Sequence, residues 1–270
     1  MNALHALVLG IVQGLTEFLP VSSSGHLVVI PWILGWGSPS LVFDTTVHWG
    51  TLLAVVIYFW NDLVNLVVVG WNGLVKFSLE DPEARLAWGI VVATIPGALA
   101  GALLDKWFES LFQKPMYVGV ALLVTASILF LGERIGRRTR DTGSINWLDA
   151  VLIGTAQAFA IIPGISRSGS TMSTGLARNL KREVAARYSF LLSVPIIFGA
   201  GLFKLKDLLE TGVTGNEALV LVVGFVAAAV SGYLAIDFLM KFVRTKPFYV
   251  FAAYCLAAGA FVLAYGAFVR

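Results

Sequence analysis

The sequence predicts an all-α polytopic membrane protein with six transmembrane helices. Of its 270 residues, 58% are hydrophobic and only 13% are charged, whereas soluble domains carry about 25% charged residues. Several uncharged stretches also approach or exceed the roughly 17–25 residues that a helix needs to cross a bilayer. A water-soluble fold does not fit this composition.

The six predicted spans differ in how apolar they are. Four contain no charged residue, and another runs from about Tyr188 to Phe203. The first span in the chain is expected to start near Thr45, pass Asp62 and end near Val75. The four uncharged stretches are 86–104, 115–132, 218–236 and 247–269.

The distribution of Lys and Arg predicts the orientation of these spans. The net charge of +3 does not imply a nucleic-acid partner. If six helices cross, thirteen basic residues fall on one face and five on the other, which places the first face in the cytoplasm. Both termini are then extracytoplasmic. The thirteen residues are Lys76, Arg85, Arg134, Arg137, Arg138, Arg140, Arg178, Lys181, Arg182, Arg187, Lys241, Arg244 and Lys246.

Two halves of the chain are predicted to be related by an inverted-topology repeat, 1–133 and 147–270, joined by a basic linker. Each half holds one hairpin and three spans, and because three is odd the second half enters the membrane from the opposite side. A shift of 144 positions aligns six identical residues around two polar segments. They are Ala6, Gly10, Gln13, Ser22, Ser24 and Gly25 with Ala150, Gly154, Gln157, Ser166, Ser168 and Gly169.

The two polar segments are predicted to be re-entrant helix-loop-helix hairpins. A helix over 5–18 reaches about 21 Å, against a hydrocarbon thickness of roughly 30 Å. Pro20 ends it before a short second helix over 27–34, and Pro163-Gly164 divides the second hairpin in the same way. Irregular backbone at this depth requires burial in protein or a water-filled cavity, so the hairpins predict a polar chamber near the midplane.

Glu17 is the first candidate for chemistry, because it is the only Asp, Glu, Lys or Arg in residues 1–43. A carboxylate at the bilayer centre costs roughly 2.5–3.5 kcal/mol unless it is solvated or paired. Gln13 lies four residues earlier on the same helix face, and a structural hydrogen bond between helices is the alternative. Arg167 offers a planar fork that matches phosphate oxygens, or it pairs only with Glu17.

Serine-rich loops supply the remaining candidates. In the second hairpin, hydroxyl groups and the first N–H groups of a short helix favour an anion, here phosphate, bound by Ser166, Ser168 and Thr171. In the first hairpin, one serine hydroxyl could be a nucleophile if Glu17 or His26 lies within reach, and helix capping is the alternative for Ser22, Ser23 and Ser24.

Histidines are candidates for proton carriers or metal ligands. His26 could move a proton at neutral pH, although a lone histidine is more often a hydrogen-bonded structural residue. His48 and Asp44 on the first full span are weaker candidates of the same kind.

The segments 13–26 and 163–170 resemble the two signature motifs of the bacitracin-resistance type undecaprenyl pyrophosphate phosphatases. The resemblance implies hydrolysis of undecaprenyl diphosphate at the outer face of the cytoplasmic (inner) membrane, which recycles the lipid carrier for peptidoglycan synthesis. It also implies a divalent cation, Mg²⁺ or Ca²⁺. The family's first motif begins with Glu or Gln; here it begins with Gln13, so Glu17 is the metal-binding carboxylate that remains.

These motifs lead to a predicted mechanism and to its rivals. Ser23 or an activated water attacks the diphosphate, His26 helps proton transfer, and Glu17 binds the cation or acts as base. Arg167 and the loop hydroxyls hold the phosphates, with Gln13, Ser22 and Ser24 beside them.

The rival class is a transporter that flips the monophosphorylated carrier, since inverted repeats with broken helices occur in transporters. A phosphate-binding regulator is a third interpretation. A homodimer is possible, because glycine-rich runs such as 97–101 permit helix contacts.

Overall fold

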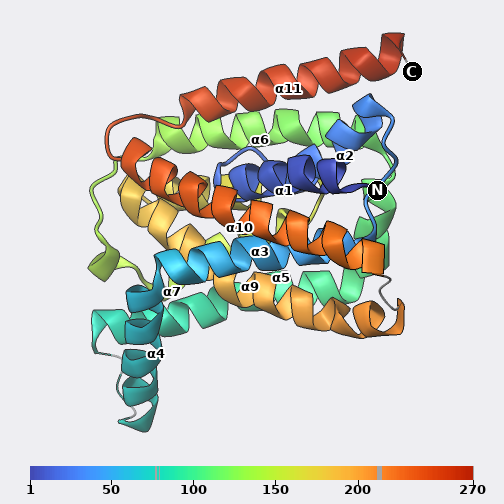
Figure 1. The fold of residues 1–270 in the computed structure, drawn as a ribbon. Coiled ribbons are helices and arrows are strands. Elements are labelled where there is room, and N and C mark those ends of the chain that lie inside the picture. The colour runs from blue at the N-terminus through green and yellow to red at the C-terminus, as the bar shows by residue number, and fades with distance from the viewer. Residues whose placement is uncertain (77, 79, 212–214, 270) are drawn as a thin grey trace.

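The computed structural model describes residues 1–76, 78, 80–211 and 215–269 and contains no β-strand in these ranges. Most helices run side by side along one direction (Figure 1). The α-helices are α1 (Ala3–Phe18), α2 (Ser23–Leu34), α3 (Leu41–Tyr58), α4 (Trp60–Val75), α5 (Pro82–Phe112), α6 (Pro115–Ile135), α7 (Trp147–Phe159), α8 (Arg167–Ala177), α9 (Arg182–Thr211), α10 (Gly215–Phe242) and α11 (Tyr249–Phe268).

Six helices are long and apolar enough to cross a membrane, which confirms the predicted fold class. The ends of the last five agree with those of the predicted spans to within six residues. The six segments are Leu41–Tyr58, Pro82–Leu104, Pro115–Ile135, Arg182–Lys204, Glu217–Phe242 and Tyr249–Phe268.

The prediction of one span from Thr45 to Val75 is wrong. The chain breaks at Phe59, and α4 runs across the direction of the other helices (Figure 1). The break gives the polar residues of α4 partners at the bundle end: Asp62 accepts from Arg187 at 2.7 Å and Asn65 donates to Glu83 at 2.7 Å. A straight continuation of α3, which is already 18 residues long, would carry both side chains past the end of the bundle and away from these partners.

Two pairs of short helices, α1–α2 and α7–α8, have the lengths expected of the hairpins. They contain 16, 12, 13 and 11 residues, fewer than a span requires. α1 starts at the end of the bundle that holds both termini, and α7 starts at the end that holds the linker 136–146 (Figure 1). Their depth in a bilayer stays a prediction.

Helix neighbours follow one pattern in both halves. α1 packs against α10 of the second half, and α7 packs against α5 of the first half. α3 likewise contacts α10 while α9 contacts α5, and the pairs α3–α9 and α6–α11 join the halves. If each helix is replaced by its counterpart in the other half, every one of these contacts maps onto another contact in the set. α4 falls outside this correspondence and is an insertion in the first half. The packing supports the inverted repeat, whose boundaries at 1–133 and 147–270 stay a prediction.

Glycines set the distance between α1 and α10. A Cβ atom at Gly14 would lie 2.0 Å from Ser231 Oγ, and one at Gly10 would lie 2.5 Å from the Gly224 carbonyl oxygen. Gly154 on α7 is equally restricted, since its Cβ would lie 2.4 Å from the Ala93 carbonyl oxygen on α5. The first helix of each hairpin is thus held in backbone contact with a span of the other half.

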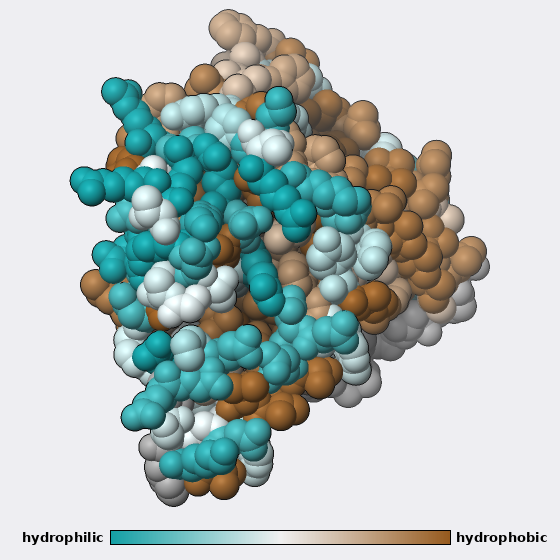
Figure 2. Space-filling model, turned by 90° about the vertical axis from the view of Figure 1, so that its left-hand side faces the viewer, coloured by the Kyte–Doolittle hydropathy of each residue, from teal (hydrophilic) through white to brown (hydrophobic). Residues whose placement is uncertain are grey.

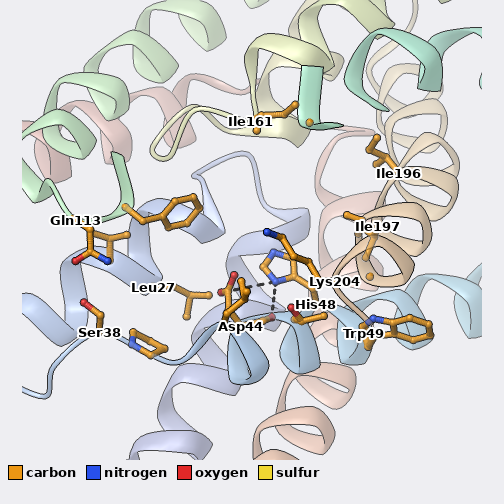
Figure 3. A pocket seen from close by; sticks show the side chains of 18 residues that line it. Leu27, Ser38, Asp44, His48, Trp49, Gln113, Ile161, Ile196, Ile197 and Lys204 are labelled. Carbon is orange, nitrogen blue, oxygen red and sulfur yellow. Dashed lines mark hydrogen bonds and ion pairs between the residues drawn. The ribbon is translucent and has the colours of Figure 1, made fainter. Parts of the chain in front are cut away.

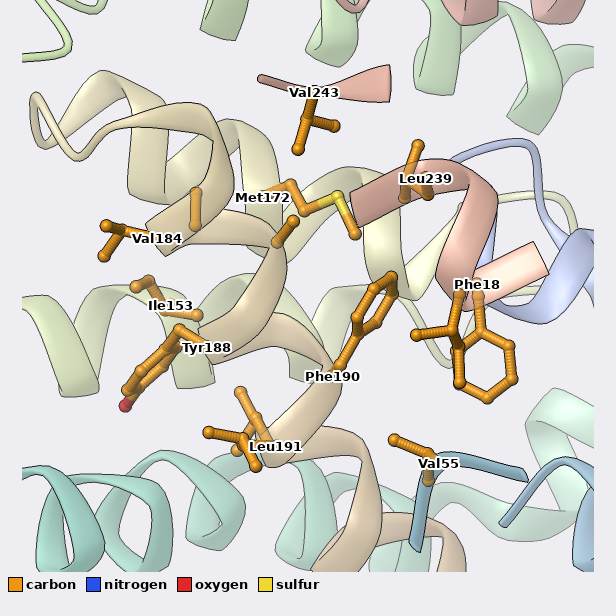
Figure 4. Close-up of a cluster of buried hydrophobic side chains, with 14 of the residues drawn as sticks. Phe18, Val55, Ile153, Met172, Val184, Tyr188, Phe190, Leu191, Leu239 and Val243 are labelled. Carbon is orange, nitrogen blue, oxygen red and sulfur yellow. The ribbon is translucent and has the colours of Figure 1, made fainter. Parts of the chain in front are cut away.

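The main hydrophobic core packs residues of both hairpins against residues of the spans (Figure 4). Phe18, at the end of α1, meets Phe190 of α9 edge to face at a centroid distance of 5.4 Å. Met172 of α8 is fully buried in the same cluster. Since Phe18 and Met172 flank the polar loops in sequence, their burial fixes where the loops can lie.

Polar side chains gather at the linker end of the bundle (Figure 2). Two fully buried carboxylates organise it. Glu133 accepts from Arg182 at 3.0 Å and from the Phe248 N–H at 3.0 Å. Asp149 pairs with Arg140 and Arg178, each at 2.6 Å; burial raises the pKa of Asp149, but these hydrogen bonds outweigh burial and the pKa is lowered. These contacts fasten α6, α7 and the start of α9 to the linker.

Candidate active site

Glu17 is the point at which the two predicted hairpins meet. Its side chain is 7% exposed, near the end of α1. One carboxylate oxygen, Oε1, accepts from Arg167 Nη2 at 2.8 Å. The other, Oε2, accepts from Ser23 Oγ at 2.5 Å and from Gln13 Nε2 at 3.1 Å. The structure therefore brings residues about 150 positions apart onto one carboxylate, as the convergence of the hairpins predicts.

Both loops end in a capped helix. Ser22 has a positive φ of 72° and caps α2 by accepting from the Gly25 N–H at 3.3 Å. Ser166 caps α8 by accepting from the Gly169 N–H at 3.0 Å. The same serine-to-glycine spacing in the two halves thus has a local cause, helix capping, and it directs the N-terminal ends of α2 and α8 toward Glu17.

Direct contacts hold the loops against each other. Ser168 Oγ donates to the Leu19 carbonyl at 3.2 Å, and the Gly164 N–H donates to Ser24 Oγ at 3.5 Å. Gly164 has a φ of +94°, and a Cβ atom there would lie 2.7 Å from Ala121 Cβ. Thr125 of α6 bridges the second loop, donating to the Gly164 carbonyl at 2.9 Å and accepting from the Ser166 N–H at 3.0 Å.

Arg167 is oriented by groups behind it. Its Nη1 donates to the Ser189 carbonyl at 3.2 Å, and the side chain is 13% exposed. Thr171 lies one turn later, with Oγ1 2.6 Å from Ser189 Oγ. Of the predicted phosphate ligands, Arg167 reaches Glu17, while Ser166, Ser168 and Thr171 all form hydrogen bonds that shape the loop.

His26 is not joined to this cluster. Its Nδ1 lies 2.7 Å from the Ser22 carbonyl oxygen and its Nε2 lies 2.7 Å from the Tyr254 hydroxyl, so both ring nitrogens have partners. The histidine at Glu17 is instead His48, whose Nε2 lies 3.8 Å from Glu17 Oε2. From the sequence His48 is a weaker candidate than His26, because the sequence does not show that the span carrying His48 lies beside Glu17.

A cavity of about 540 Å³ adjoins the cluster on the side of His48 (Figure 3). Its walls are mainly apolar, and Asp44, His48 and Lys204 contribute polar groups. Ser38 and Gln113 lie at its edge, in or beside the loops that precede α3 and α6. The cavity therefore opens at the end of the bundle opposite the linker.

The groups at this position that could ligate a hard cation through oxygen are the Glu17 carboxylate and the Gln13 side-chain amide. The described part of the chain holds no group of three or more His, Cys, Asp or Glu side chains suited to a metal ion. However, Gln13 is fully buried and its Oε1 has no hydrogen-bond partner. A carboxylate beside a free amide oxygen fits a hard cation that completes its coordination with substrate oxygens, as Mg²⁺ commonly does.

The fold and this site define a class: polytopic helical membrane proteins in which two broken helices bring a carboxylate, a serine and an arginine together. Residues 6–261 match the family described as bacitracin resistance protein BacA, and the chain belongs to this family. This match confirms the family that segments 13–26 and 163–170 indicate.

Curated relatives span nearly the whole chain. An undecaprenyl-diphosphatase of Moorella thermoacetica is 44% identical over 98% of both chains. One from Pelotomaculum thermopropionicum is 43% identical over 97% of this chain and 96% of its own. Another, from Desulforudis audaxviator, is 45% identical over 97% of each.

Gly164→Ala is expected to destabilise the protein more than Gly37→Ala. Both glycines have positive φ, but a Cβ atom at Gly37 meets nothing within 4 Å. Backbone strain costs about 1–3 kcal/mol at either position, and overpacking adds about 1–3 kcal/mol only at Gly164. Melting temperatures in detergent measure the difference. Equal losses in the two variants would show that the loops are not packed as described.

Proposed function

We propose that the carboxylate shared by Ser23 and Arg167 is the catalytic centre of a lipid phosphatase. The chain is a membrane phosphatase that hydrolyses undecaprenyl diphosphate to undecaprenyl phosphate and phosphate, and so recycles the lipid carrier for cell-wall synthesis. The single observation that carries the site assignment is the pair of contacts at Glu17: Ser23 on one oxygen and Arg167 on the other.

Ser23 is the proposed nucleophile and Glu17 its base. The hydroxyl already donates to Glu17 Oε2 at 2.5 Å, the arrangement that activates a serine. Its oxygen bonds to the terminal phosphorus, the bridging P–O bond breaks, undecaprenyl phosphate leaves, and the hydroxyl proton moves to Glu17. Water then hydrolyses the phosphoserine. Direct attack by water is the alternative, and phosphate trapped on Ser23 distinguishes the two routes.

Arg167 is the proposed phosphate clamp. In the structure its guanidinium donates to Glu17, and an arriving diphosphate offers oxygens that compete for the same fork. The N-terminal N–H groups of α8 add a favourable field for an anion. Ser166, Ser168 and Thr171, with Ser22 and Ser24 of the first loop, shape the site, and any contact they make with substrate belongs to this proposal.

A divalent cation, Mg²⁺ or Ca²⁺, is the proposed cofactor. Glu17 and the free Oε1 of Gln13 are the residues that would hold it. When bound, the cation supplies positive charge that stabilises the diphosphate and the developing charge on the leaving oxygen. Proton transfer by His26 is left out of the proposal, because both of its ring nitrogens have other partners.

We place the protein in the cytoplasmic membrane with the site open to the extracytoplasmic side. The cavity beside His48 opens at the end of the bundle opposite the linker. Arg134, Arg137 and other basic residues gather at the linker end, and basic residues favour the cytoplasm. The names of the relatives favour hydrolysis over lipid flipping. A homodimer stays a prediction.

Phosphate release in detergent tests the function and the site together. The purified protein is expected to release phosphate from a polyprenyl diphosphate, whereas a transporter needs two compartments. Glu17→Gln and Arg167→Ala are each expected to reduce the rate at least about 100-fold, the scale of losing one electrostatic group in an active site. Glu183→Gln, in an exposed ion pair with Arg244, is the control. Near-normal rates in either site variant would contradict the assignment.

Removal of divalent cations is expected to stop turnover. EDTA should abolish phosphate release, and Mg²⁺ or Ca²⁺ should restore it, because a diphosphate needs more positive charge than Arg167 alone provides. Gln13→Leu, which removes the free amide oxygen, should raise the cation concentration needed for half-maximal rate. Undiminished activity in chelator would exclude a cation from the reaction.

A further inference from the structure

One face of α6 supports the loop of the second hairpin. Val118, Ala121 and Thr125 lie three and four residues apart, so they share this face, and all three are buried. A Cβ atom at Gly164 would lie 2.8 Å from the Val118 carbonyl oxygen and 2.7 Å from Ala121 Cβ. The loop backbone therefore rests directly on α6, with no space for a side chain at Gly164.

Thr125 makes two hydrogen bonds to this backbone. Its hydroxyl donates to the Gly164 carbonyl at 2.9 Å and accepts from the Ser166 N–H at 3.0 Å. By comparison, the Gly164 N–H donates to Ser24 Oγ of the first hairpin at 3.5 Å. Thr125, Gly164 and Ser166 are all buried, so loss of the hydroxyl would leave a buried donor and a buried acceptor without this partner.

The two bonds act on Arg167 through the start of α8. Ser166 is the N-cap residue of α8, and Arg167 is its first residue. Thr125 holds the Ser166 N–H, while Ser166 Oγ accepts from the Gly169 N–H at 3.0 Å. From this fixed position the Arg167 guanidinium reaches Glu17 Oε1 at 2.8 Å. The Thr125 hydroxyl thus controls where Arg167 leaves the loop, through backbone atoms.

The first hairpin has a weaker anchor of the same kind. Pro20 precedes Gly164 by 144 positions, the shift that aligns the two polar segments. The Pro20 carbonyl accepts from Cys255 Sγ at 3.7 Å. Cys255 lies on α11, the last span of its half, as α6 is the last span of the first half. Each loop carbonyl is therefore held from the opposite half, and because a thiol is a weak donor, Thr125 is the stronger anchor.

We propose that Thr125 is a positioning residue for the phosphatase reaction, holding Arg167 in place beside Glu17 through the loop backbone. The inference rests on the proposed function. Displacing a group in an active site by about 1 Å can lower a rate on the order of 100-fold. Thr125 does not line the apolar cavity, so its hydroxyl does not contribute to holding a lipid chain there. Loss of the hydroxyl should therefore lower kcat more than it changes KM.

Paired substitutions separate the hydroxyl from the shape of the side chain. Thr125→Val removes the hydroxyl and keeps the shape, whereas Thr125→Ser keeps the hydroxyl and removes the methyl group. Per folded molecule, Thr125→Val is expected to lower kcat for a polyprenyl diphosphate about 10-fold or more, and Thr125→Ser to keep most of the rate. Thr125→Ala repeats the comparison with Ser in a smaller side chain. The control is Thr94→Val, because the Thr94 hydroxyl donates to the Ile90 carbonyl of its own helix at 2.8 Å.

Amide hydrogen exchange reports on the loop without depending on turnover. Thr125→Val should speed exchange in segment 163–170, where the Ser166 N–H loses its acceptor, and Thr94→Val should not. Wild-type kcat in Thr125→Val, or a loss in Thr125→Ser as large as in Thr125→Ala, would overturn the proposal. Unchanged exchange in Thr125→Val would overturn it as well. Wild-type protein that releases no phosphate would instead overturn the proposed function, and this role with it, whatever the exchange shows.

Discussion

A carboxylate buried near the centre of a membrane protein is the constraint on which the rest of this structure depends. Glu17 is tolerated because three donors from both halves of the chain surround it: Arg167, Ser23 and Gln13. An unpaired charge in this place would be expensive. The geometry of the hairpins follows, since α1 must end beside α8 and both loops must bring their backbones within van der Waals contact.

The same constraint divides the site into a polar and an apolar part. Polar groups converge on Glu17, while the cavity on the His48 side is lined mostly by side chains such as Leu27, Ile161 and Ile197. A lipid diphosphate has the same division, with a charged head and a long hydrocarbon chain. Under the proposed function, the headgroup would bind at Arg167 while the first isoprene units would stay in these apolar surroundings.

Much of this structure could be predicted because bilayers impose simple rules. Span length predicted five helices closely, and the isolated charge at Glu17 predicted a paired residue with Arg167 opposite. The break at Phe59 was missed because the run through Asp62 still looks apolar, and only the partners Arg187 and Glu83 explain the turn. The contact of His48 with Glu17 could not be predicted, because the sequence does not show which imidazole a distant helix brings to this carboxylate.

The most direct test of the account is a double-mutant cycle between Glu17 and Arg167, measured on thermal unfolding of the purified protein in detergent. Glu17→Gln and Arg167→Ala each leave a buried group without its partner, so the account predicts that the double variant loses less stability than the two single losses combined. The expected coupling exceeds about 0.5 kcal/mol, the limit for independent sites. Losses that add within this limit would show that the two hairpins do not share the carboxylate, and would contradict the site and the mechanism built on it.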